Sequence, residues 1–150
     1  MTAVSLDPRV EAFLAAGTTR LLIGGDWVDA ADGATFETLN PATGEPLMRC
    51  AAADSEDVDR AVAAATAAAD GSWRQVTPSE RGRLLWRVAE LLERDADALA
   101  QLEVLDMGKP LRLARDDDLP MAIDHFRYFA GWATKLEGET IPVSAGASST

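Results

Sequence analysis

Helices with long apolar stripes dominate the second half of this sequence, whereas its strands are short. From residue 54 onward, the spacing of apolar residues changes from a period of two towards the period of about 3.6 that defines an α-helix. Two such stripes are Val58, Ala61, Val62 and Ala65, and then Leu84, Leu85, Val88, Leu91 and Leu92. No segment reads as the Val- and Ile-rich buried strand of a parallel sheet. We therefore expect these helices to need a sheet that the sequence does not supply.

Start and stop signals divide the chain into helices. Residues 77–80 predict a capping box, with a threonine cap, a proline in the first turn and a glutamate three residues after the cap. Gly108 is expected to end a helix in the left-handed conformation just before Pro110, which begins another short helix. The other predicted starts are Asp7–Pro8, Asp54, Asp95 and a point near Pro120, and the other predicted stops are Gly17, Gly71 and Gly138.

The first fifty residues are predicted to be largely strand and turn. Gly24 and Gly25 separate residues 21–23 from residues 27–28, and this pair tolerates the positive φ of a tight hairpin turn. Residues 35–39 alternate as a strand, and residues 46–51 form another strand after a loop. The predicted fold class is α/β, with an early β-hairpin and strands followed by several amphipathic helices.

Composition excludes several classes of function. The chain has 14 basic and 25 acidic residues and a net charge of −11, whereas nucleic-acid backbones are bound by basic faces. Acidic runs such as 54–59 are expected to be solvated surface. No stretch reaches the roughly 20 apolar residues of a membrane span, and Met1–Asp7 lacks the parts of an export signal. One cysteine and one histidine leave neither an intrachain disulfide nor a zinc set. We expect a cytoplasmic location, with no nucleic-acid or membrane partner.

Four ordered motifs carry a resemblance to a known family. They are residues 22–27 (Leu-Ile-Gly-Gly-Asp-Trp), residues 36–45 (Phe-Glu-Thr-Leu-Asn-Pro-Ala-Thr-Gly-Glu), residues 105–110 (Leu-Asp-Met-Gly-Lys-Pro) with residues 126–133, and residues 138–143 (Gly-Glu-Thr-Ile-Pro-Val). Their order and spacing resemble the N-terminal portion of the aldehyde dehydrogenase superfamily. Members of that family are several times longer than this chain.

The resemblance implies an enzyme that oxidises an aldehyde to a carboxylic acid with NAD or NADP, and a homo-oligomer in full-length form. Residues 1–150 would be the N-terminal part of the NAD(P)-binding domain, with a hairpin and strand region at about 21–51 and a helical region at about 54–137. The main nucleotide-binding sheet and the catalytic domain would be missing. No position matches the family's nucleophilic cysteine, glutamate base, oxyanion-binding asparagine or cofactor motif, so the chain alone is predicted to be inactive.

No individual residue of this sequence is expected to take over the role of the family's catalytic or cofactor-binding residues. Cys50 has no glycine-rich surroundings and no neighbouring base, and His125 lies on an aromatic helical stripe, so both are expected to be structural. Gly24–Gly25 lacks the third glycine and the following helix of a dinucleotide-binding loop. Lys109 is expected to interact with a helix C-terminus, and residues 116–118 to form a solvated helix end instead of a calcium loop.

The resemblance also implies one metal site. Some members hold a potassium or sodium ion through main-chain oxygens near their Asn-Pro and Asp-x-Gly-Lys-Pro motifs. The matching positions here are Leu39 and Asp106, with Thr38 as a further candidate. Oxygen ligands suit a hard monovalent cation, and carbonyl groups at the end of an element are free to supply them. Other ligands would come from residues outside this sequence.

The substrate and the role of the chain have several interpretations. Residues 108–120 and 126–128 look similar to members acting on aromatic aldehydes such as phenylacetaldehyde, with betaine aldehyde and aliphatic aldehydes as alternatives. A different hypothesis is a non-catalytic protein-interaction or oligomerisation module that uses exposed apolar helix faces. A third is a truncated reading frame whose product lacks a stable core.

Overall fold

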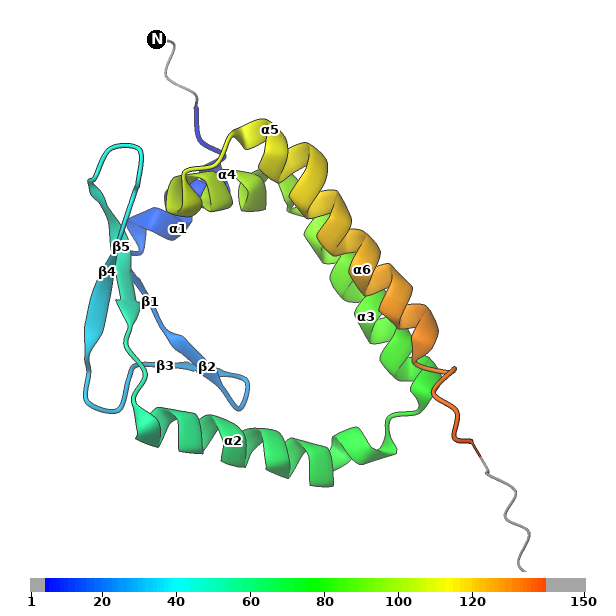
Figure 1. Cartoon of the computed structure of the whole chain (residues 1–150). Coiled ribbons are helices and arrows are strands. Elements are labelled where there is room, and N and C mark those ends of the chain that lie inside the picture. The colour runs from blue at the N-terminus through cyan, green and yellow to red at the C-terminus, as the bar shows by residue number, and fades with distance from the viewer. Residues whose placement is uncertain (1–4, 140–150) are drawn as a thin grey trace, which may run out of the picture.

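The computed structural model describes residues 5–139, and its elements form an open ring (Figure 1). The strands lie on one side of the ring and α2 (Ser55–Asp70) forms the next side. The paired helices α3 (Pro78–Arg94) and α6 (Leu119–Trp132) form the third side. α1 (Pro8–Ala15) and α4 (Ala96–Met107) close the remaining corner. The predicted α/β class, with early strands and later helices, is confirmed.

The strands form two small sheets. β2 (Leu21–Ile23) and β3 (Asp26–Val28) make the predicted hairpin, in which Gly24 and Gly25 have φ values of 64° and 97°. β4 (Thr35–Leu39) pairs antiparallel with β5 (Pro46–Ala51), also as predicted. A further strand, β1 (Thr18–Thr19), pairs parallel with β5 and was not predicted, because two threonines carry no alternation pattern. None of these strands is fully buried, which agrees with the expectation that a covering sheet is missing.

Most helix boundaries follow the predicted signals. Asp54 and Asp57 form a capping box at the start of α2, and Thr77 and Glu80 form one at the start of α3. Asp95 precedes α4 as predicted, but its side chain makes no cap hydrogen bond because it binds two arginines instead. Gly108 ends α4 with a φ of 72°, in the left-handed conformation.

The last helical stretch is more continuous than expected. Pro110 precedes the short helix α5 (Leu111–Leu113), which runs into a π-helical turn, η2 (Ala114–Asp118), and then into α6. α6 begins at Leu119, as the predicted helix start near Pro120 required, and the π-helical turn lies just before it. α6 ends at Trp132, ahead of Gly138, and residues 140–143 of the fourth motif lie outside the described residues. A 3-10 helix, η1 (Ser72–Gln75), links α2 to α3.

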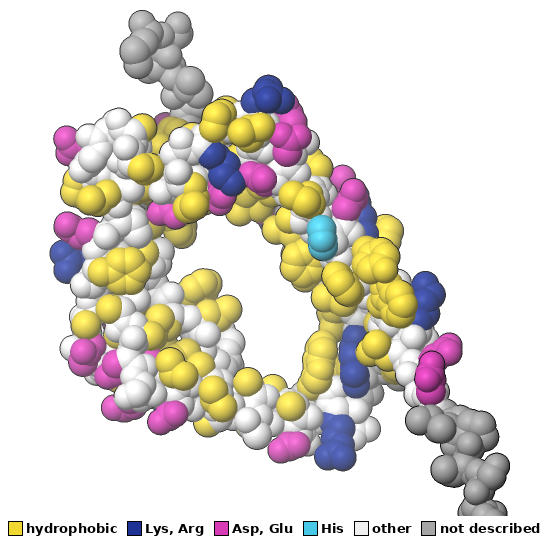
Figure 2. Space-filling model, viewed as in Figure 1, with side chains coloured by type: hydrophobic (Ala, Val, Ile, Leu, Met, Phe, Trp, Pro, Cys, Tyr) yellow, Lys and Arg dark blue, Asp and Glu magenta, His cyan; other side chains and the backbone are white. Residues whose placement is uncertain are grey.

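Burial is concentrated in small side chains. The buried apolar residues of the described chain are Val10, Ala30, Ala89, Ala98, Ala100, Ala114 and Ile123. Most of them are alanines, whereas large residues such as Trp132 and Leu84 are 42% and 49% exposed. Figure 2 shows hydrophobic side chains around the open centre of the ring. The described residues thus contain no core of large apolar side chains. None of the described helices is long and apolar enough to span a membrane.

One acidic residue contradicts the expectation of a solvated surface. Asp57 is only 1% exposed, and its carboxylate accepts hydrogen bonds from the backbone N–H of Ala31 and from Arg60. This residue lies in the run 54–59, where the sequence shows only a charged helix start. The Asp57 carboxylate thereby links the first turn of α2 by hydrogen bonds to the segment that follows β3.

Candidate functional site

Two of the sequence motifs meet where the loop of residues 40–44 touches the end of α4. The left-handed backbone of Gly108 passes so close to Pro41 that a Cβ atom on Gly108 would lie 2.7 Å from the Pro41 Cγ. Only glycine combines a φ of 72° with this approach. We call this region, with Thr38, Leu39, Asp106 and Lys109 beside it, the α4 junction.

Local hydrogen bonds shape the loop side of the α4 junction. The Asn40 side-chain oxygen accepts from the Ala42 N–H at 2.9 Å, and the Asn40 carbonyl accepts from the Gly44 N–H at 2.7 Å. The β4–β5 pairing shifts register between Thr38 and Leu39, just before this loop. Such an irregularity interrupts the regular ladder of backbone hydrogen bonds.

A cavity of about 240 Å³ opens beside the α4 junction. Its lining residues come from α1, the strands and α4: Phe13, Leu14, Thr19, Thr38, Leu47, Met48, Cys50, Leu102, Leu105 and Asp106. Thr38 and Asp106 therefore line the same cavity. Leu39 does not line it, and its side chain is 51% exposed.

Cys50 and His125 are not arranged for thiol chemistry. Cys50 is half-buried on the cavity wall, where most of the lining side chains are apolar. His125, the single histidine of the chain, lies on α6 on the opposite side of the ring, where it is coloured cyan in Figure 2. Its Nδ1 is 2.7 Å from the Met121 carbonyl oxygen of the same helix. The described residues that line this cavity include no histidine to activate the Cys50 thiol.

Lys109 joins two carboxylates at the α4 junction. Its ammonium is 2.7 Å from Asp118 and 2.8 Å from Glu103. The hydrogen bond to Asp118, and then that to Glu103, raises the pKa of Lys109 above its ordinary value. Lys109 does follow the C-terminus of α4, as predicted, but Asp118 is half-buried and paired instead of being a freely solvated helix end. The π-helical turn brings Asp118 to this position.

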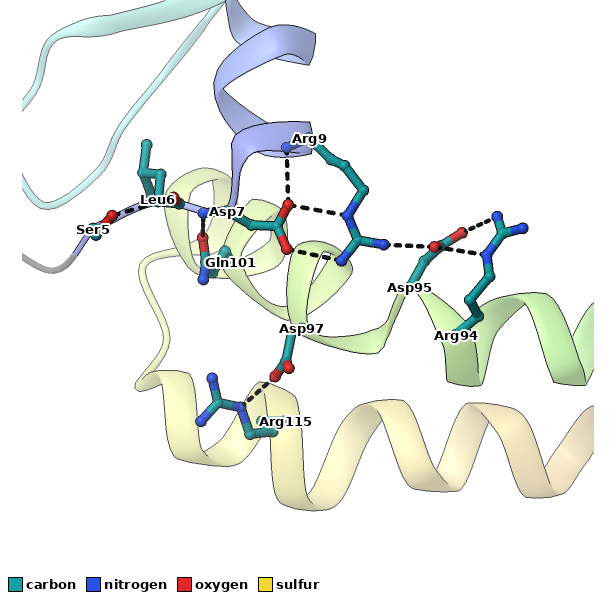
Figure 3. Close-up of polar contacts among 9 residues, drawn as sticks. All are labelled: Ser5, Leu6, Asp7, Arg9, Arg94, Asp95, Asp97, Gln101 and Arg115. Atoms are coloured by element: carbon teal, nitrogen blue, oxygen red, sulfur yellow. Dashed lines mark hydrogen bonds and ion pairs between the residues drawn. The ribbon is translucent and has the colours of Figure 1, made fainter.

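A second polar cluster ties α1 to the α3–α4 turn (Figure 3). Asp7 caps α1 and accepts two side-chain hydrogen bonds from Arg9, at 2.7 and 3.0 Å. Arg9 also binds Asp95 at 2.6 Å, and Asp95 in turn binds Arg94 at 2.6 Å. The side-chain hydrogen bond from Arg9 lowers the pKa of Asp7 from its ordinary value of 3.8 to about 2.

Sequence reasoning missed this second cluster, which spans 86 positions between Arg9 and Asp95. No spacing rule connects residues so far apart, and the only available signal was the acidic cap with its nearby arginine. The cluster consists of exposed and half-buried side chains that hold α1 against the start of α4.

The described residues hold no ready-made site for a transition metal or a dinucleotide. Residues 5–139 contain no group of three or more His, Cys, Asp or Glu side chains placed to hold a metal ion. Gly24 and Gly25 form the turn of a hairpin and lead into β3, not into a helix N-terminus that could receive a pyrophosphate. The oxygen atoms of the α4 junction are the remaining candidates for binding an ion.

Comparison with known proteins gives consistent matches. Residues 27–150 match the model of the aldehyde dehydrogenase family. The chain is 53% identical over 137 residues to a putative aldehyde dehydrogenase, DhaS, of Bacillus subtilis, which covers 91% of this chain and 28% of that protein. It is 50% identical over 126 residues to human mitochondrial aldehyde dehydrogenase, covering 83% of this chain and 24% of the relative.

Solved structures give the same result. An aldehyde dehydrogenase of Bacillus cereus in complex with NAD+ matches with a TM-score of 0.91 and 46% identity, over 95% of this chain and 29% of the longer one. The chain thus spans less than a third of the length of these relatives. The family match, the sequence identity and the shared backbone together show that this chain belongs to the aldehyde dehydrogenase family.

Proposed function

We propose that this chain is the N-terminal part of an NAD(P)-dependent aldehyde dehydrogenase, which oxidises an aldehyde to a carboxylic acid. The observation that carries the proposal is the match to the Bacillus cereus enzyme, which was solved with NAD+ bound. Its 46% identity and TM-score of 0.91 extend over 95% of this chain. The chain would therefore contribute the first part of an NAD(P)-binding domain, with strands at about 21–51 and helices at about 54–137.

The proposal assigns the chemistry to residues beyond this chain. NAD(P), held by residues beyond this chain, would supply the hydride acceptor for the oxidation, and water would supply the second carboxylate oxygen. The family resemblance implies a cysteine that attacks the aldehyde carbon and a glutamate that acts as a general base, and neither has a counterpart among the described residues. Cys50 does not take the place of that cysteine, because the described residues that line its cavity are mostly apolar and include no histidine. The expected role of residues 5–139 is structural: they form the first part of the domain that binds the cofactor.

The α4 junction is the proposed site for a monovalent cation. Asp106 and Thr38 line one cavity, and the register shift at Thr38 and Leu39 interrupts the strand ladder next to them. Main-chain oxygens of Leu39 and Asp106, with Thr38 as a further donor, suit potassium or sodium. Leu39 is 51% exposed, and the remaining ligands are expected to come from residues outside this chain.

An aromatic aldehyde such as phenylacetaldehyde is the proposed substrate, with betaine aldehyde and aliphatic aldehydes as alternatives. The support is the sequence likeness of residues 108–120 and 126–128. One matched structure is a betaine aldehyde dehydrogenase of Staphylococcus aureus, with 34% identity over 89% of this chain.

The decisive experiment joins residues 1–150 to the part of Bacillus subtilis DhaS that follows its matched segment. The fusion is expected to form NADH with phenylacetaldehyde, whereas the chain alone forms none. The DhaS part without this chain serves as the control. NADH formation by the chain alone, or a folded fusion that binds NAD+ but oxidises no aldehyde, would contradict the proposal.

A second candidate function is a protein-interaction or oligomerisation module, which the exposed apolar side chains favour. Phe129 is 54% exposed and Trp132 is 42% exposed on the same helix. Such surfaces on a folded chain commonly mark contact sites. Homo-oligomerisation in the cytoplasm is part of the proposal, and the free thiol of Cys50 fits a reducing compartment.

A further inference from the structure

A cavity of about 620 Å³ lies between α3 and α6. Its lining residues are Trp73, Arg81, Leu84, Leu85, Val88, Phe129, Trp132, Ala133 and Leu136. We call this surface the α3–α6 groove. Among the described residues that line the groove, Arg81 is the only charged one. A surface of this size and composition is typical of a contact with other polypeptide.

The groove is fixed in shape by contacts beneath it. α3 and α6 approach so closely that a Cβ atom on Gly82 would lie 2.7 Å from the Ala130 carbonyl oxygen. Arg81 is held at the groove by a hydrogen bond of 3.1 Å from its Nε to the Val76 carbonyl oxygen. Its guanidinium also lies 5.8 Å from the centre of the Trp73 ring. The apolar side chains above this base remain open, since Leu84 is 49% exposed and Leu136 is 84% exposed.

We propose that the α3–α6 groove binds the later polypeptide of an aldehyde dehydrogenase chain, and that this binding does not need a covalent link. This inference rests on the proposed function and names the partner of the groove. The Bacillus cereus structure holds the same backbone shape in a protein of which the match covers 29%. More than two thirds of that protein lies outside the match and is available to cover the exposed apolar side chains of this region.

The chemistry of the groove defines what the partner must present. Its contact face is apolar, because all lining residues other than Arg81 are apolar. A carboxylate or a helix C-terminus of the partner would meet Arg81, whose hydrogen bond and ring contact already hold it in place. Burying an unpaired charge against such a face is unfavourable, so charged substitutions in the groove should weaken binding sharply.

The test uses residues 1–150 and the later part of Bacillus subtilis DhaS, expressed as separate chains. Sedimentation should show a one-to-one complex. Val88→Asp and Leu84→Lys should each weaken it roughly tenfold or more, whichever charge is introduced. Leu113→Asp is the matched control, because Leu113 and Val88 are both 37% exposed and Leu113 lies outside the groove. Circular dichroism of each variant alone shows whether its helices are retained.

The outcomes separate this inference from the proposed function. A complex that forms and is weakened by the groove variants, but produces no NADH, supports the inference and contradicts the function. An active fusion of the two parts whose separate chains do not bind, or bind equally with Val88→Asp, overturns the inference and leaves the function standing. Self-association of residues 1–150 that the same variants abolish would assign the groove to a second copy and overturn the proposal.

Discussion

The α4 junction and the α3–α6 groove differ in how their surfaces are stabilised. At the α4 junction, Lys109 pairs with two carboxylates and Gly108 rests against Pro41, so the contacts are made within the chain. In the α3–α6 groove, Leu84, Phe129 and Trp132 remain about half exposed. The junction is therefore fixed by specific polar and steric contacts. The groove keeps its apolar surface exposed. The junction is thus stabilised by contacts within the chain, whereas the apolar side chains of the groove have no such cover from the described residues.

The largest effect is expected at the α4 junction. Gly108→Ala should destabilise the fold by about 2–4 kcal/mol, since a φ of 72° is strained for alanine and its Cβ would overlap Pro41. Gly33→Ala is the matched control, because Gly33 also has a φ of 72° but its Cβ would meet nothing within 4 Å. The control should lose about 1–2 kcal/mol, from strain alone. Urea unfolding followed by circular dichroism measures both, and equal losses would mean that the Pro41 contact is unimportant.

The base of the α3–α6 groove should respond to a similar change. Gly82→Ala places a methyl group 2.7 Å from the Ala130 carbonyl oxygen and should cost about 1–3 kcal/mol. Gly131→Ala, in the same helix pair, meets only the mobile end of Lys135 and should stabilise the helix by up to about 1 kcal/mol. Both variants gain the same helix propensity, so their difference in thermal unfolding isolates the contact. Stabilisation by both would show that the helices can move apart freely.

The start of α3 offers a smaller test on the same side of the ring. Thr77→Ala removes the hydroxyl that accepts from the Glu80 N–H and should lower the stability of the helix by about 1 kcal/mol. Thr77→Ser keeps the cap and should behave like the original chain. A loss of helical circular dichroism signal with alanine but not with serine is the expected result. The same loss with serine would point to the lost methyl group, not to the cap.

The smallest effect is expected on acidification, at the cluster that fastens α1. The hydrogen bond from Arg9 lowers the pKa of Asp7 to about 2, so its stabilising contribution is present above the ordinary value of 3.8. That contribution is lost as the pH falls from about 4 to about 2. Asp7→Asn should already lack it at neutral pH and should show a shallower loss of stability over this range. Identical pH profiles for the two proteins would mean that Arg9 does not stabilise the folded chain through Asp7.

Local signals predicted most of the elements. The threonine and glutamate of residues 77–80 mark the start of α3, and the glycine pair at residues 24–25 marks the hairpin turn. These succeed because a cap or a tight turn needs only its own few residues. β1 was missed because its two residues become a strand only through pairing with β5. Asp57 was misjudged because its burial depends on Ala31, far away in the sequence.

The candidate site was predicted only in part. Asp106 and Thr38 were selected from family motifs, and the structure places both on one cavity. Leu39 lies beside that cavity but does not line it, so the proposed ion site there stays a prediction. The ion pair between Lys109 and Asp118 could not be predicted. The π-helical turn that brings Asp118 close to Lys109 has no reliable sequence signature.

The sequence by itself determined the family, the order of strands and helices, and the apolar stripes that lack cover. These features depend on local chemistry, in which each cap, turn or periodic stripe is complete within a short stretch of chain. Only the tertiary structure decided that Gly108 meets Pro41, that Arg9 reaches Asp95, and that α3 and α6 leave an open apolar groove. Those contacts join residues far apart in the sequence, and their geometry follows from packing in three dimensions, not from any local pattern.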